Sequence, residues 1–244
     1  MSFRPCCVIP SRNHHLAVAQ VVARARAAGL PVFLVDDASA EPARGVLAAL
    51  AGEGVRVTRL EQRAGKGGAV MLGFRQAAEA GFTHAVQLDA DGQHDLDRLA
   101  DLLALARGQP LALVSGAARY DASVPKARRW GRYLTHFWVW VETLSFTISD
   151  SMCGFRAYPL AATLRLMQRA HIGAFMDFDT EVMVRLYWQG TPVVMLPVDV
   201  VYPANNTSNF DMLRDNWRIT KMHTRLTLAM LPRAPLLLWR KLRA

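Results

Sequence analysis

The sequence has 244 residues and a mass of 27.1 kDa, a length that favours one large domain or one domain with an appendage. With 52% hydrophobic and 20% charged residues, the composition excludes a disordered chain, a collagen-like repeat and a disulfide scaffold. The formal net charge is +9. The three cysteines form no CxxC pair, which argues against a zinc ribbon and is typical of a reducing cytosol.

Short apolar runs alternate with segments of helical period through the first half of the chain. Strands are predicted at residues 6–9, 32–35, 55–60, 84–88 and 111–115. Helices are predicted at residues 14–29, 42–51 and 69–81 and around residues 96–106. Repeated βα units of this length predict an α/β fold, in which helices flank both faces of a mostly parallel sheet.

The pattern changes after the fifth predicted strand. A long segment rich in arginine and aromatic residues includes Phe137, Trp138 and Trp140, which we expect in the core or against a membrane. Further along, a helix is predicted at residues 179–189, a strand at 193–200 and a last helix from about 210. Because no linker separates these segments from the first half, we expect one domain over residues 1–210. Residues 211–244 are expected to form a basic amphipathic helical tail.

This C-terminal tail carries much of the positive charge. Residues 212–244 hold eight basic side chains and one acid, for a net charge of +7. At 100° per residue, four basic positions fall in one stripe beside Phe210 and Trp217. They are Arg214, Arg218, Lys221 and Arg225. Cations mixed with Trp, Leu and Met fit an anionic membrane surface better than nucleic acid, so no nucleic-acid partner is expected.

The same sequence argues against a membrane-spanning protein. No segment reaches the roughly 18–20 uncharged residues that a span requires. Only five residues precede the first apolar run, which leaves no room for a signal peptide. We therefore expect a cytoplasmic protein that lies peripherally on the inner face of the plasma membrane.

Acidic residues follow the predicted strands at three places. Asp36 and Asp37 come after the second strand, Asp89 and Asp91 come after the fourth, and Asp150 lies further along. In an open parallel sheet, ligands bind at the carboxyl ends of the strands. Because these carboxylates have no obvious basic partners in the sequence, we expect a divalent cation or ligand groups to neutralise them. The Asp89-x-Asp91 pair at a strand end favours Mg²⁺ or Mn²⁺ bound to a diphosphate.

A glycine-rich turn, residues 63–68 (RAGKGG), precedes the third predicted helix. Glycines there allow backbone amides to approach phosphate oxygens, and the start of the helix favours negative charge. The spacing is not that of a P-loop, and the turn follows the third strand and not the first, unlike a dinucleotide-binding fingerprint. Lys66 and Gly67 are therefore candidate phosphate contacts.

Four of these segments, in this order, resemble the successive motifs of glycosyltransferase family 2, whose fold is called GT-A. They are residues 9–13 (IPSRN), 35–39 (VDDAS), 65–69 (GKGGA) and 88–94 (LDADGQH). Residues 150–156 (DSMCGFR) resemble the acceptor loop of the dolichyl-phosphate mannose synthase-like branch. Residues 178–181 (FDTE) resemble the helix start where inverting members keep their catalytic base.

The resemblance implies a role for each matching position. Nucleotide-binding residues would be Pro10, Asp36, Asp37, Lys66, Gly67, Asp89 and Arg156. The metal ligands would be Asp89 and Asp91, with Asp91 the more direct one. Asp150, Gly154, Phe155 and Arg156 would border the donor sugar and the acceptor.

Two departures from the family pattern affect these assignments. Asp179 sits where the second acid of the family's Glu-Asp pair falls, and Phe178 replaces the first, so Asp179 is the predicted base and Glu181 its runner-up. Over residues 201–210 an asparagine-rich run replaces the arginine and Gly-x-Ser-Lys of the branch. In this stretch the sequence is more similar to transferases found with aryl-polyene lipid biosynthesis.

The resemblance implies an inverting, metal-dependent transfer of a sugar from a UDP- or GDP-sugar to a lipid-linked or lipid acceptor at the cytoplasmic membrane face. If the acceptor is a polyprenyl phosphate, a group of arginines would hold it: Arg119, Arg128, Arg129, Arg132 and Arg156. Two alternatives remain open from the sequence. They are a sugar-phosphate nucleotidyltransferase and a non-catalytic adaptor on a membrane surface.

Overall fold

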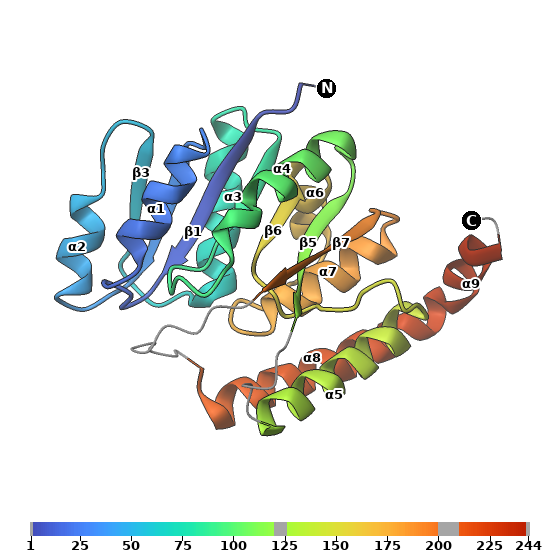
Figure 1. Ribbon diagram of the computed structural model, residues 1–244. Helices are drawn as coiled ribbons and strands as arrows, with labels where there is room; N and C mark the ends of the chain where they lie inside the picture. Colours follow the sequence, from blue (N-terminus) through green and yellow to red (C-terminus); the bar gives the residue numbers. More distant parts are fainter. Residues whose placement is uncertain (1, 120–125, 200–209, 243–244) are drawn as a thin grey trace.

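The computed structural model describes residues 2–119, 126–199 and 210–242, with the backbone alone for residues 126–130. Seven strands in this part of the chain form one sheet, in the order β3-β2-β1-β4-β6-β5-β7 (Figure 1). The strands are β1 (Pro5–Ser11), β2 (Val32–Asp37), β3 (Val55–Leu60), β4 (His84–Gln87), β5 (Leu113–Arg119), β6 (Arg156–Pro159) and β7 (Val193–Asp199). All neighbouring pairs are parallel except those of β6, which runs antiparallel between β4 and β5.

The described helices pack on both faces of this sheet. They are α1 (Val18–Ala27), α2 (Ala43–Ala49), α3 (Gly65–Glu79), α4 (Leu99–Gly108), α5 (Lys126–Thr143), α6 (Leu160–Arg169), α7 (Phe178–Trp188), α8 (Met212–Met230) and α9 (Ala234–Leu242). Cys6 and Val8 of β1 pack in a core with α3, α6, α7 and α8, whereas Cys7 and Ile9 face α1, α2 and α4. The predicted α/β fold, a mostly parallel sheet flanked by helices, is confirmed.

Helices α5 and α8 lie side by side below the sheet in Figure 1, and α9 continues from α8 toward the C-terminus. Met222 and Leu226 of α8 are buried in the same core as α7. His223 Nδ1 lies 2.8 Å from Glu142 Oε1 of α5, and both side chains are buried. The first part of the C-terminal tail is thus packed onto the domain. Within the described ranges, no helix combines the length and the apolar character needed to cross a bilayer.

The structure differs from the sequence-based prediction in several elements, and helices α5 and α6 lie where no element was predicted. The predicted helix at 14–29 begins only at Val18, because Asn13 adopts a positive φ of 58° and turns the chain before it. The helix predicted from residue 69 begins already at Gly65, so the glycine-rich turn forms its first turn. Strand β6 was not predicted. The asparagine-rich stretch and the last residue of the predicted strand 193–200 lie outside the described residues.

Candidate functional site

The predicted site residues come together at the carboxyl edge of the sheet. Asp36 and Asp37 end β2, and Asp89 follows β4. These two strands flank β1, so the three carboxylates lie around the end of β1. Lys66 in the first turn of α3 and Asp179 in the first turn of α7 reach the same edge, since Lys66 contacts both Asp89 and Asp179.

The carboxylates of Asp36 and Asp37 form hydrogen bonds and an ion pair within the protein. Asp37 accepts hydrogen bonds from the backbone N–H of Ala64 at 2.6 Å and of Gly65 at 3.0 Å, and thereby fixes the start of α3. Asp36 pairs with Arg59 and also accepts from a backbone N–H at 2.9 Å. Both aspartates are buried, as is Pro10 on β1. The structure therefore brings both predicted nucleotide-binding acids to the site, where Asp37 fixes the glycine turn and Asp36 holds Arg59.

The glycines of this turn are required by the packing of the segment that leads into α7. Gly65 has a φ of +83°, and a Cβ there would lie 2.3 Å from the carbonyl oxygen of Ala174. A Cβ at Gly67 would lie 2.5 Å from Cβ of Phe178. Gly68 donates its N–H to Ala174 at 3.0 Å. This close approach of α3 and α7 places Lys66 beside Asp179.

Lys66 is the centre of the site. Its Nζ lies 2.8 Å from Asp89 Oδ1, 3.0 Å from Asp89 Oδ2 and 2.8 Å from Asp179 Oδ2. Burial acts to lower the pKa of Lys66, but the charges of Asp179 and Asp89 raise it above its ordinary value. Burial acts to raise the pKa of Asp89, yet Lys66 and His94 hold it well below its usual range. The cluster therefore carries one ammonium against an ionised Asp89 and the Asp179 carboxyl.

Gln87 belongs to this cluster, and the sequence analysis missed it. Its side chain is fully buried and donates from Nε2 to Asp179 Oδ1 at 2.9 Å. Gln87 is the last residue of β4, so its backbone holds the side chain at the edge of the sheet. The available signal was a polar residue that ends an apolar strand directly before the Asp89 motif.

Asp89 and Asp91 are the candidate metal ligands. Within the described part of the chain, the Asp91 carboxylate accepts one hydrogen bond, from the backbone N–H of Gln93 at 3.0 Å. A Cβ at Gly154 would lie 2.6 Å from Asp89 Oδ2, so the acceptor loop leaves room for this carboxylate only because it carries glycine there. The described residues hold no group of three or more His, Cys, Asp or Glu arranged for a metal. Two carboxylates completed by water and substrate phosphates are typical of Mg²⁺, so this donor set fits a cation that binds with the nucleotide.

Asp150 holds the acceptor loop in place. It is buried and accepts the backbone N–H groups of Ala118 at 3.1 Å and Met152 at 2.8 Å. Arg132 Nη2 lies 2.8 Å from Asp150 Oδ2, and His136 Nε2 lies 3.6 Å from Oδ1. Burial acts to raise the pKa of Asp150, but His136 and Arg132 lower it overall. In this arrangement Asp150 positions the loop, and it has little capacity left to take up a proton.

Arg156 and Glu181 are both fully buried, and their polar groups face protein partners. Arg156 donates to the backbone carbonyls of Ser151 at 2.6 Å and of Asp179, so it joins the acceptor loop to α7. Glu181 accepts from Arg185 and from Arg225 of α8, and from a backbone N–H at 2.8 Å. Of the two predicted bases, Asp179 lies in the Lys66 cluster and Glu181 faces α8.

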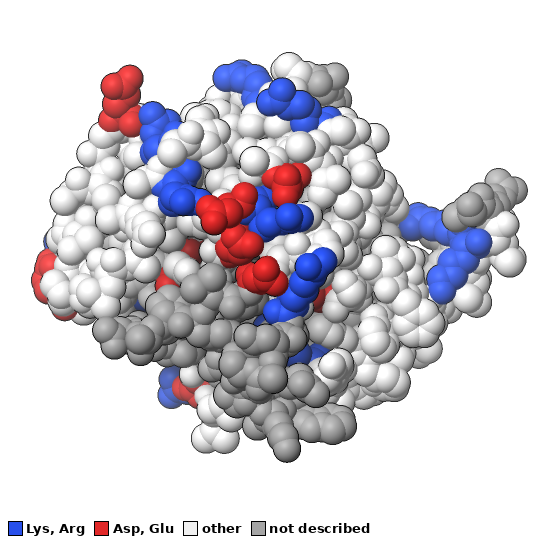
Figure 2. Space-filling view, in the orientation of Figure 1, with Lys and Arg blue, Asp and Glu red and all other residues white. Residues whose placement is uncertain are grey.

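The expectation that the three acidic groups have no basic partners is wrong. Arg59 pairs with Asp36, Lys66 with Asp89 and Arg132 with Asp150. These partners lie far from the acids in sequence, so the pairing depends on the tertiary fold. Figure 2 shows acidic and basic side chains next to one another near the middle of the visible face. Of the other arginines proposed to hold a phosphate, Arg119 is exposed at the end of β5, and the side chains of residues 128 and 129 lie outside the described part.

The comparisons with known proteins agree with this geometry. The family model described as "Glycosyl transferase family 2" matches residues 6–173. An undecaprenyl-phosphate mannosyltransferase from Micrococcus luteus is 29% identical over 206 residues, which are 81% of this chain and 84% of that protein. A dolichyl-phosphate beta-glucosyltransferase from Dictyostelium discoideum is 26% identical over 153 residues, 59% of this chain and 46% of that protein.

Solved structures share the fold. Glucosyl-3-phosphoglycerate synthase from Mycobacterium tuberculosis in complex with UDP superposes with a TM-score of 0.68 at 15% identity, over 93% of this chain and 79% of that chain. The same enzyme with Mn²⁺, UDP and phosphoglyceric acid gives a TM-score of 0.66 over 93% of this chain and 78% of that chain. The predicted GT-A fold is thereby confirmed.

Proposed function

The chain belongs to glycosyltransferase family 2, and from this premise we propose that it transfers a sugar from a UDP- or GDP-sugar to a polyprenyl phosphate or a related lipid-linked acceptor. The observation that carries the proposal is the cluster of Lys66, Asp89 and Asp179 at the carboxyl edge of the sheet. Both relatives described above, an undecaprenyl-phosphate mannosyltransferase and a dolichyl-phosphate beta-glucosyltransferase, are named for a polyisoprenyl phosphate, which supports an acceptor of this class. Inversion at the anomeric carbon is part of the proposal, because a single displacement needs only one nucleophile.

The chain's own residues prepare the donor side of this reaction. Asp37 fixes the glycine turn through two backbone N–H groups, and the turn presents Lys66 at the start of α3. The Lys66 ammonium would bind the diphosphate, where negative charge develops as the sugar departs. Asp89 and Asp91 would hold Mg²⁺ or Mn²⁺, which would supply further positive charge to that leaving group. Gly154 lies directly against the Asp89 carboxylate, which fits there only because this residue has no Cβ.

On the acceptor side, the role of Asp179 depends on the nucleophile. A hydroxyl acceptor must lose a proton, and Asp179 would accept it. Gln87 Nε2, which donates to Asp179 Oδ1 at 2.9 Å, would orient this carboxylate. A polyprenyl phosphate is already anionic and needs no strong base. Asp179 would then orient Lys66 and exclude a second anion from that side of the site.

A transfer assay tests this function. The protein is incubated with labelled UDP- and GDP-sugars, undecaprenyl phosphate and Mn²⁺, and the label in the lipid phase is measured. We expect label transfer with one donor class and a product of inverted anomeric configuration by NMR. Formation of a nucleotide sugar from sugar phosphate and nucleoside triphosphate would favour the nucleotidyltransferase alternative. If the protein neither binds a nucleotide nor turns over any donor, the result would favour the membrane-surface adaptor.

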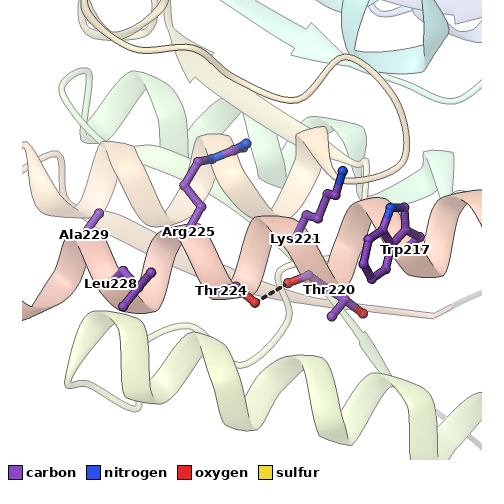
Figure 3. Close-up of a pocket in the computed structure, with 7 residues that line it drawn as sticks. All are labelled: Trp217, Thr220, Lys221, Thr224, Arg225, Leu228 and Ala229. Carbon is purple, nitrogen blue, oxygen red and sulfur yellow. Dashed lines mark hydrogen bonds between the residues drawn. The ribbon is translucent and has the colours of Figure 1, made fainter.

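We further propose that α8, with α5 and α9, lies on the anionic inner leaflet of the plasma membrane. A groove of about 670 Å³ runs along α8, and Figure 3 shows Lys221 and Arg225 projecting to one side of the helix with Trp217 beside Lys221. The ends of the groove are apolar, since Trp217 is 61% and Leu228 63% exposed. The other large apolar side chains exposed on these helices include Leu134 and Phe137 on α5 and Leu238 and Trp239 on α9.

Lys221 beside exposed aromatic and aliphatic side chains is complementary to an anionic lipid surface. Arg225 is already paired with Glu181 and adds little to this attraction. Co-sedimentation with vesicles of phosphatidylglycerol and phosphatidylcholine measures this contact. We expect binding to anionic vesicles at low salt and release at high salt, and a Lys221→Gln, Trp217→Ala double variant should bind several-fold more weakly. Equal binding to neutral and anionic vesicles, or no binding at low salt, would contradict the proposed surface.

A further inference from the structure

The Lys66 ammonium is held among carboxylate oxygens. Three of them lie within 3.0 Å of Nζ, both of Asp89 and Oδ2 of Asp179, and Nζ donates a hydrogen bond to Asp89 Oδ2. Asp89 Oδ1 is buried and has no hydrogen-bond partner among the described residues, so only the ion pair with Lys66 satisfies it. The Lys66 side chain is only 18% exposed, so these contacts are largely shielded from solvent. Lys66 therefore already serves as the counter-ion of the candidate metal ligand Asp89.

A divalent cation on Asp89 would meet this ammonium at close range. Both oxygens of Asp89 contact Nζ, so a metal bound to either would lie a few ångströms from a like charge. At that separation the two positive charges repel each other in a partly shielded site, so the ammonium should weaken the binding of the cation. Gly154 and His94 close other sides of the carboxylate, which limits how far it can turn away.

From this geometry we infer that Lys66 is an internal competitor of the divalent cation, and that it yields Asp89 only when the diphosphate of a nucleotide offers it other oxygens. The inference rests on the proposed nucleotide-sugar donor. Metal and nucleotide should then bind cooperatively, because the diphosphate removes the ammonium from Asp89 and supplies further ligands to the metal. Lys66 acts here as a positioning residue, and its removal should strengthen metal binding in the absence of nucleotide.

Mn²⁺ binding, followed by the electron paramagnetic resonance of the free ion, tests this directly without any turnover. Lys66→Gln should bind Mn²⁺ about tenfold more tightly than the wild type when no nucleotide is present. Lys66→Arg, which keeps the charge, should stay close to the wild type, and so should Lys241→Gln on exposed α9. An unchanged or lower affinity in Lys66→Gln, with its thermal unfolding still cooperative, would overturn the inference.

A second measurement covers the case in which Lys66→Gln does not fold. The wild type should bind Mn²⁺ at least about tenfold more tightly with saturating UDP or GDP than without it, and equal affinity in both conditions would overturn the inference. Failure of the proposed function gives a different result. If the Mn²⁺ affinities change as expected but no sugar is transferred, the competition between Lys66 and the cation is supported and the proposed transferase function is contradicted.

Discussion

Two pairs of carboxylates lie at the same edge of the sheet and are held in different ways. Asp36 and Asp37 bind backbone N–H groups and the Arg59 side chain, so their oxygens are fixed by the fold itself. Asp89 and Asp179 are held chiefly by one lysine, with Gln87 as a further donor to Asp179. Backbone donors cannot leave without unfolding the turn, whereas a lysine side chain can swing away. The first pair therefore shapes the site, and the second pair is free to exchange partners during a reaction.

Helix α7 shows the same contrast between two neighbouring acids. Asp179 points to Lys66, and Glu181 points to Arg185 and Arg225. Two residues along an α-helix correspond to a rotation of about 200°, so these side chains must leave opposite faces. One acid therefore serves the site, and the other joins α7 to α8.

The largest expected effect concerns the candidate metal ligands beside the pair of Asp89 and Asp179. Asp91→Asn should lower sugar transfer by about 100-fold or more, because it removes charge from the candidate metal ligands. The fold should be unaffected, since among the described residues the carboxylate accepts one backbone N–H, which an asparagine oxygen can also accept. Transfer rates and thermal unfolding of the variant are compared with those of the wild type. Full activity of the variant, or of the wild type in EDTA, would remove the metal from the account.

Glu181→Gln should act on stability. Replacing this fully buried carboxylate leaves Arg185 and Arg225 without their charged partner and should cost about 3 kcal/mol of unfolding free energy. Urea denaturation measures the loss. Asp179→Asn is the matched variant, and it should be less destabilising while reducing transfer to a hydroxyl acceptor far more than transfer to a lipid phosphate. If Glu181→Gln is stable but inactive, Glu181 would be the catalytic base and Asp179 the structural acid, contrary to this assignment.

Asp37→Ala tests the fixed side of the site. It releases two backbone donors, so the unfolding free energy should fall by about 2 kcal/mol and the affinity for UDP or GDP should drop several-fold. Calorimetric titration with each nucleotide gives the affinity. Unchanged nucleotide affinity together with reduced stability would show that the turn can loosen without affecting the pocket.

The smallest expected effect is a pH dependence at Asp150. Because the folded-state pKa of Asp150 lies below its unfolded value, its contribution to stability is fully present above about pH 4–5 and is lost as the pH falls through the folded pKa. Asp150→Asn should therefore show a shallower loss of unfolding free energy between about pH 5 and pH 3. Asp101→Asn on exposed α4 serves as the control and should follow the wild type. Identical slopes for Asp150→Asn and the wild type would contradict the role assigned to Asp150.

Much of this organisation could be predicted from local sequence. The apolar runs predicted the strands that carry Asp37 and Asp89, and the order of the motifs indicated the family. The ion pairs could not be predicted, because Lys66 and Asp179 meet only after α3 packs against the segment before α7. Strand β6 was missed because its four residues, which begin with Arg156 and end with Pro159, show no apolar run. Helical geometry alone could have predicted that Asp179 and Glu181 point in opposite directions.

A crystal structure with UDP or GDP and Mn²⁺ would test the central claim most directly, namely that the Lys66 cluster is the site of sugar transfer and exchanges its partners there. The account predicts a diphosphate within hydrogen-bond distance of Lys66 Nζ, Mn²⁺ on Asp89 or Asp91, and no remaining contact between Lys66 and Asp89. A nucleotide bound at another edge of the sheet would contradict it. So would a bound diphosphate with Lys66 still on both Asp89 and Asp179.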